Sequence, residues 1–265
     1  MANKRKGFEL IIETQNNNNF EYIKRNNPDL IVEHDGWIVK LCYENSEIVE
    51  KLIKQNDNYS ISFAELVFKG IVLENGEEFL KTDKKSIEAM IRIIDDDNST
   101  QVWQHGKERI FRMAEYIGNP KNNFWNRLKA RDITLVEELI TSAKNTSGDG
   151  DNLISLSSKI CKYLSQFMYN NFDGYFISDR FVKRALPFYC AHYNIEIEGL
   201  DLKKPTCNFF NDYKYEALHK ALLQLQKEIN TGVEKDKVLT KHQIDHIMWF
   251  CYRSRTEVED ERNPI

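Results

Sequence analysis

A succession of helix-like segments from residue 84 to residue 252 constrains the fold more than any other feature of this chain. Apolar residues recur near the 3.6-residue period of an amphipathic helix, most clearly between Thr100 and Met113. The predicted helices cover residues 84–95, 100–118, 122–130, 134–144, 151–169, 179–193, 213–230 and 240–252. Thr240 followed by Gln243 has the form of a capping box at the start of the last helix. The sequence therefore predicts a mainly α-helical protein.

The N-terminal part has a different pattern. Residues 8–13, 30–33 and 37–43 are rich in β-branched and aromatic residues, which favours short strands. Ser46 is a predicted N-cap for a helix that ends at Gln55. Residues 61–79 fit either a helix followed by a hairpin or strands alone, with a turn at Asn75-Gly76. We expect a small α/β part over residues 1–84 and an α-helical domain over residues 85–265.

Charge is distributed unevenly along the chain, which has 265 residues and a net charge of −4. Residues 101–131 carry few acidic side chains, Glu108 and Glu115. The basic side chains of the same stretch are Lys107, Arg109, Arg112, Lys121, Arg127, Lys129 and Arg131. A polyanion would therefore meet a local patch and not the whole surface. On charge alone, solvated helix faces are the simpler interpretation.

The five cysteines show no C-x-x-C spacing, which argues against a disulfide framework, a zinc site and an iron–sulfur cluster. No apolar run approaches the length of a membrane span. His242 and His246 have the i, i+4 spacing of metal ligands, but the sequence offers no obvious third ligand. A helix face packed on Trp249 is the favoured interpretation. We expect a cytoplasmic monomer with no cofactor, no metal and no membrane contact.

Two short motifs, whose Lys159 and Asp179 lie 20 positions apart, resemble a known enzyme superfamily. The run Leu153-Ile-Ser-Leu-Ser-Ser-Lys159 resembles the hairpin turn of helix-hairpin-helix DNA glycosylases, whose usual form is Leu-Pro-Gly-Val-Gly-x-Lys. The run Asp179-Arg-Phe-Val-Lys-Arg184 is similar to that family's Asp-x-x-Val-x-Arg. An α/β part ahead of a helical bundle resembles the 8-oxoguanine DNA glycosylase branch. Ser155 and Ser157 stand where the family has glycines, and Ile154 stands where it has proline.

The resemblance implies a DNA glycosylase, with AP-lyase activity, that extrudes a damaged or modified base and attacks C1′ of its sugar. Lys159, which we expect to open a helix after a turn at 153–158, would be the nucleophile. Asp179, the predicted cap of the next helix, would stabilise the cationic sugar, and both side chains would face one cleft. The implied DNA-binding residues are Ser155, Ser157, Ser158, Lys162, Arg180, Lys183 and Arg184. The base-pocket candidates are Phe209, Phe210, Trp249 and Trp125.

Three alternatives stay open on the sequence alone. The chain could be a non-catalytic DNA-binding or interaction protein of the same fold, because the hairpin glycines are missing. Removal of modified bases in phage defence is a second setting for the same chemistry. Lys159 and Asp179 could also be a solvated helix lysine and a plain N-cap. A metal nuclease is disfavoured, because Asp95-Asp96-Asp97 stands alone as an acidic cluster.

Overall fold

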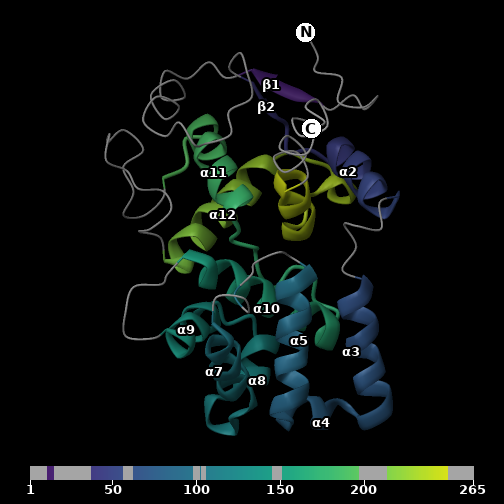
Figure 1. Cartoon of the computed structure of the whole chain (residues 1–265). Helices are drawn as coiled ribbons and strands as arrows, with labels where there is room; N and C mark the ends of the chain where they lie inside the picture. The colour runs from purple at the N-terminus through teal and green to yellow at the C-terminus, as the bar shows by residue number, and fades with distance from the viewer. Residues whose placement is uncertain are drawn as a thin grey trace, which may run out of the picture. The chain divides into compact units, whose positions relative to one another are not determined.

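The structure is a computed structural model of the chain and describes residues 11–14, 37–55, 62–97, 102, 106–144, 151–196 and 214–249. Most of these residues are helical, which confirms the predicted class (Figure 1). The chain forms two compact units. Unit 1 comprises residues 1–59, 179–212 and 217–265, and unit 2 comprises residues 60–178 and 213–216. The units divide after residues 59 and 178, whereas the sequence suggested a division after residue 84.

Unit 2 is built from helices whose apolar faces meet in one core. They are α3 (Ser62–Asn75), α4 (Glu77–Thr82), α5 (Lys84–Asp97), α7 (Lys107–Gly118), α8 (Phe124–Lys129), α9 (Thr134–Ala143) and α10 (Asp151–Tyr169), with a 3₁₀ turn at Pro120–Asn122. Helices α5, α7, α9 and α10 make the most extensive contacts. Ile91, Met113, Leu139 and Leu156 are fully buried among them. Helical periodicity thus predicted α5, α7, α8, α9 and α10, although α7 begins at Lys107 and not at residue 100.

The segment that the sequence left open is helical. Val67, Ile71 and Val72 of α3 pack at helical spacing against the cluster of Phe68 and Met90. The ring of Phe68 lies 5.3 Å from that of Phe167 in α10. This packing favours the helix. The predicted turn at Asn75-Gly76 is confirmed, since Gly76 has a φ of 83°, but it joins α3 to α4 and not two strands.

Unit 1 contains the two strands and the remaining helices. Its elements are β1 (Ile12–Thr14), β2 (Trp37–Val39), α2 (Tyr43–Gln55), α11 (Arg180–His192), α12 (Tyr215–Ile229), a 3₁₀ turn at Lys235–Lys237 and a helix over residues 241–249. The first two residues of α12 belong to unit 2. Strands β1 and β2 are antiparallel, with Ile12 opposite Val39. The predicted strand at 30–33 lies outside the described residues.

Buried polar side chains fasten the strands to the helices of unit 1. The Asn45 side chain accepts a hydrogen bond from Ile11 N (2.9 Å) and donates to the carbonyls of Ile11 and Lys40 (2.8 Å each). The Tyr189 hydroxyl of α11 donates to Val39 O at 2.6 Å. Helix α2 begins at Tyr43, so the predicted cap Ser46 lies inside its first turn. That prediction is wrong, because Ser46 N already donates to Cys42 O at 3.1 Å as part of the helical ladder.

The start of the last described helix follows the predicted capping box. Thr240 N donates to Gln243 Oε1 at 2.9 Å, and Gln243 N donates to Thr240 Oγ1 at 3.2 Å. The prediction is confirmed. Over the described residues, no helix combines the length and apolar character needed to cross a bilayer.

Arg127 organises a polar network between α8 and α9 in unit 2. Its guanidinium donates to Asp132 Oδ2 (2.8 Å), to both carboxylate oxygens of Glu138 (2.5 and 2.9 Å) and to Thr134 Oγ1 (2.8 Å). The Tyr116 hydroxyl also bonds to Glu138. The hydrogen bond from Arg127 lowers the pKa of Glu138 below its ordinary value of 4.5. The ionised carboxylate therefore stabilises the folded chain.

Replacing Glu138 should reduce the amount by which the free energy of unfolding falls as the pH is lowered. A pKa that is lower in the folded state gives a stabilisation that is present above about pH 4.5 and is lost as the pH falls through the folded value. Glu138 is 42% exposed, so solvent screening keeps its contribution to about 1 kcal/mol or less. Urea unfolding from neutral pH to about pH 3 should therefore show a shallower loss of stability for Glu138→Gln than for the wild type. Glu108→Gln, at an exposed carboxylate of α7, is the control and should follow the wild type.

Candidate functional site: the buried lysines of helix α10

Helix α10 is continuous from Asp151 to Tyr169. This confirms the predicted helix at 151–169 and shows that the predicted hairpin turn at 153–158 is wrong. No glycine or proline interrupts the segment, and Leu153, Leu156 and Ile160 are buried at helical spacing. The Ser158 hydroxyl donates to Ser155 O at 3.0 Å, so a serine is accommodated inside the helix.

Two lysines lie in the buried part of α10. Lys159 is 5% exposed and Lys162 is 1% exposed. The two residues are three positions apart, so they lie on the same side of the helix. Lysine is among the residue types least often buried, because an ammonium group loses strong hydration when it leaves water. The expectation that Lys159 opens a helix is wrong, since it lies in the middle of α10. Its burial is the most informative polar feature of unit 2.

The loop after α10 is held against the helix. Ser178 N donates to Ser158 Oγ at 3.0 Å, and Asn171 N donates to Ser165 O at 3.2 Å. A Cβ at Gly174 would lie 2.9 Å from side-chain atoms of Asn171 and Ser165, so a larger residue there would require these side chains to move. The loop therefore fixes Ser178, the residue before Asp179, beside the residue before Lys159.

Asp179 caps helix α11. Its Oδ1 accepts a hydrogen bond from Val182 N at 2.9 Å, and the residue is 5% exposed. The N-cap interpretation is thereby confirmed. Asp179 is the first residue of a unit 1 segment, whereas Lys159 belongs to unit 2. The shared cleft stays a prediction.

The other predicted DNA-binding residues fall into two groups. Ser157, Ser158 and Lys162 are buried in α10, and Ser155 is half-buried. They do not form the exposed turn that the resemblance implied. Arg180, Lys183 and Arg184 lie in α11, but their side chains are outside the described part of the structure.

The structure describes only two of the four predicted base-pocket residues, Trp125 and Trp249. Phe209 and Phe210 lie outside the described residues. Trp125 has a structural role in unit 2, since its Nε1 donates to Lys81 O at 3.1 Å and its ring meets Phe124 edge-on at 5.3 Å. Trp249 is half-buried in the helix over 241–249.

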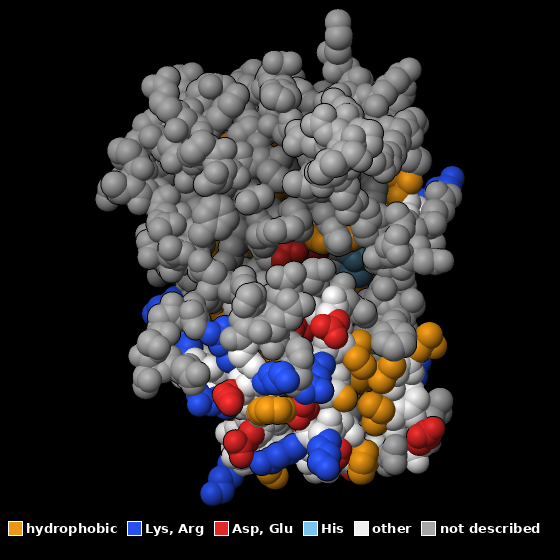
Figure 2. All heavy atoms as spheres, in the orientation of Figure 1, with side chains coloured by type: hydrophobic (Ala, Val, Ile, Leu, Met, Phe, Trp, Pro, Cys, Tyr) orange, Lys and Arg blue, Asp and Glu red, His pale blue; other side chains and the backbone are white. Residues whose placement is uncertain are grey.

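The basic stretch at 101–131 is partly a surface feature of unit 2. Figure 2 shows Lys and Arg side chains on the described face of unit 2, with carboxylates among them. Arg127 is neutralised by Asp132 and Glu138, and Arg109 is half-buried. The exposed members are Lys107, Arg112, Lys121, Lys129 and Arg131, joined by Lys144 at the end of α9. Phe111 is 44% exposed on the same helix as Lys107 and Arg112.

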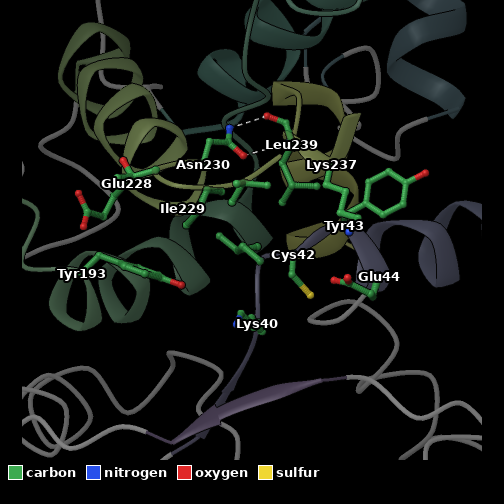
Figure 3. Close-up of a pocket in the computed structure, with 13 residues that line it drawn as sticks. Lys40, Cys42, Tyr43, Glu44, Tyr193, Glu228, Ile229, Asn230, Lys237 and Leu239 are labelled. Carbon is green, nitrogen blue, oxygen red and sulfur yellow. Dashed lines mark hydrogen bonds between the residues drawn. The ribbon is translucent and has the colours of Figure 1, made fainter. Parts of the chain in front are cut away.

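Unit 1 contains a pocket of about 380 Å³ (Figure 3). Lys40, Cys42, Glu44, Tyr193 and Lys237 contribute polar atoms to its lining. One wall is fixed by Asn230, whose side chain donates to Leu239 O (2.9 Å) and accepts from Leu239 N (2.8 Å). Burial raises the pKa of the Cys42 thiol, which disfavours a thiolate nucleophile. Neither Trp125 nor Trp249 lines this pocket.

A second polar cluster in unit 1 joins Glu50 of α2 to His242 and His246. One possible ligand atom from each residue lies within 4.8 Å of the others. Sequence spacing identified the two histidines but missed Glu50, which is 196 positions from His246. No local pattern could have revealed a partner so distant in the chain.

Comparison with known proteins adds no identification. No protein-family model matches the chain, and no curated protein or solved structure shows significant similarity to it.

Proposed function

We propose that this chain is a DNA glycosylase with AP-lyase activity that removes a damaged or modified base through Lys159. The observation that supports it best is the burial of Lys159 in the middle of α10, next to the Ser158–Ser178 hydrogen bond. Lys159 is a candidate nucleophile because its primary amine can bond to C1′ and form an imine, and its burial keeps that amine largely away from bulk water.

The proposed reaction begins with extrusion of the target nucleotide from the helical stack. The Lys159 amine attacks C1′, the bond from C1′ to the base breaks, and the base leaves with a proton. The C1′–O4′ bond then breaks, O4′ takes up a proton, and the open-chain sugar is joined to Lys159 as an imine. Loss of a C2′ proton from this imine breaks the 3′ carbon–oxygen bond by β-elimination and releases the 3′ phosphate. In this proposal the Asp179 carboxylate stabilises the positive charge on the sugar and assists the proton transfers.

A non-catalytic DNA-binding protein is the second candidate. The continuity of α10 favours it, because the hairpin that binds a phosphate in the glycosylase superfamily is replaced by helix. The cap formed by Asp179 gives that residue a structural role without catalysis. The exposed basic side chains of unit 2 are compatible with both candidates.

Borohydride trapping separates the two candidates. The full chain should be incubated with DNA duplexes and single strands that carry different base lesions and modifications, in the presence of borohydride. Reduction of the imine should give a covalent protein–DNA adduct on at least one substrate. Salt-dependent binding with no base release and no adduct on any substrate would instead support the non-catalytic protein.

DNA binding should depend strongly on salt through the basic side chains of unit 2. A plot of the logarithm of the DNA association constant against the logarithm of salt concentration has a slope of about −0.9 for each phosphate contact. The double variant Lys107→Glu, Lys144→Glu should therefore make this slope less negative by roughly 2. Both side chains are exposed. Lys69→Glu, at a 62% exposed lysine of α3, is the control and should leave the slope unchanged. Fluorescence anisotropy across a salt series measures this, and equal slopes for all proteins would exclude the basic face as the binding surface.

A further inference from the structure

We propose that Glu50, His242 and His246 bind one Zn²⁺ ion in unit 1. His246 Nδ1 lies 2.5 Å from Glu50 Oε1, and the rings of His242 and His246 have centroids 3.8 Å apart. Two imidazoles and one carboxylate are a ligand set found in zinc sites. This inference is independent of the proposed DNA chemistry, which uses Lys159 of unit 2.

Both helices that carry the ligands are fixed before any ion binds. The capping box of Thr240 and Gln243 starts the helix over 241–249, and Ile244, Ile247 and Met248 bury its other face completely. The i, i+4 spacing then directs His242 and His246 to the same side. On α2, Val49 is fully buried and Asn45 anchors the helix to β1. Rigid supporting elements of this kind hold the ligand atoms of a site close to the geometry that binding requires.

The ligand spacing is close to that of a tetrahedral site. With metal–ligand distances of about 2.0–2.1 Å, two tetrahedral ligands lie roughly 3.3 Å apart. The His246–Glu50 separation of 2.5 Å must widen by somewhat less than 1 Å, and all three ligand atoms already lie within 4.8 Å. Side-chain rotation on fixed helices is enough for such a change.

The chemistry of the ligands favours a transition-metal ion such as Zn²⁺ over Mg²⁺ or Ca²⁺. Imidazole nitrogen is a poor ligand for Mg²⁺ and Ca²⁺, which prefer oxygen, whereas it suits zinc. Three described ligands leave one position for a water molecule, as in catalytic zinc sites. Glu50 and His246 are 22% and 25% exposed, so water can reach the cluster. Such a water would be acidified by the ion.

The alternative is a metal-free arrangement in which His246 and Glu50 form a hydrogen-bonded ion pair and His242 packs against His246. The two arrangements differ in one measurable respect. An ion pair requires only two residues, whereas chelation requires all three together.

Equilibrium zinc binding tests the proposal. The full chain, first treated with a chelator, is titrated with Zn²⁺ in competition with a metal indicator. We expect one zinc per chain. Loss of an outer-sphere partner alone weakens metal binding by roughly 10- to 100-fold, so His242→Gln, His246→Gln and Glu50→Gln should each weaken it by at least that factor. His192→Gln, which removes a histidine of α11, should bind zinc like the wild type.

A second measurement does not depend on variants that must fold. One equivalent of Zn²⁺ should shift the ring NMR signals of two of the six histidines of the wild-type chain and raise its melting temperature. Absence of stoichiometric binding would overturn the proposal. So would wild-type zinc affinity in all three ligand variants, because the ion would then be held elsewhere, for example by cysteine.

Discussion

Lys159→Gln should abolish the borohydride-trapped adduct on a substrate that the wild-type protein cleaves. In the proposed mechanism the Lys159 amine nitrogen forms the bond to C1′, and an amide cannot replace it. We expect the yield of adduct to fall to background and strand cleavage to disappear with it. Because glutamine is uncharged and shorter than lysine, the buried position in α10 should tolerate it without loss of the fold. Circular dichroism and thermal unfolding monitor that condition.

Two control variants test whether loss of the adduct is specific to Lys159. Lys69→Gln removes an exposed lysine of α3 and should leave the adduct intact. Lys162→Gln removes the other buried lysine of α10, so it should retain an adduct even if its formation is slower. A folded Lys159→Gln protein that still forms the adduct would show that another amine is the nucleophile. Peptide mapping of the trapped complex would then identify that amine.

Asp179→Asn should slow base release strongly while leaving helix α11 intact. General acid–base and charge stabilisation by one positioned side chain contribute about 10²–10⁴-fold, and we expect a loss in that range. Asparagine caps a helix about as well as aspartate, so the hydrogen bond from Val182 N should persist. Single-turnover kinetics of base release measure the first effect, and urea unfolding measures the second.

Asp179→Ala removes the helix cap that Asp179→Asn retains, so comparison of the two variants separates capping from catalysis. Loss of the cap should cost about 1 kcal/mol of stability, which the asparagine variant does not lose. If Asp179 acts only as a cap, Asp179→Asn should release the base at the wild-type rate. That outcome would remove Asp179 from the proposed mechanism and leave the role of Lys159 to be judged separately.

Most of the described helices could be predicted from the sequence because their signals are local. The 3.6-residue spacing of apolar residues identified α5, α8, α9, α10, α11 and α12 within a few residues. The capping box at Thr240 and the turn at Asn75-Gly76 are also local patterns, and both are confirmed. The N-cap role of Asp179 likewise depends on residues only three positions away.

The errors arise where tertiary packing outweighs a local motif. Residues 153–158 matched a hairpin register, yet their leucines and isoleucine are buried on a continuous helix, so the core selects the helix. Ser46 is a good cap by type, but it lies in the first turn of α2, where its N–H already bonds to Cys42 O. The compact units, which divide after residues 59 and 178, are a separate matter, because they depend on contacts between segments remote in sequence that no local pattern reveals.

The sequence by itself determined the helical class, the positions of most described helices, the caps at Asp179 and Thr240, and the i, i+4 pair of histidines. Only the tertiary structure decided that Lys159 and Lys162 are buried, that Arg127 is neutralised and that Glu50 meets His246. The physical reason is the range of the interactions. Hydrogen bonds and apolar spacing within one helix are written in neighbouring residues, whereas burial and ligand clusters depend on which distant segments pack together.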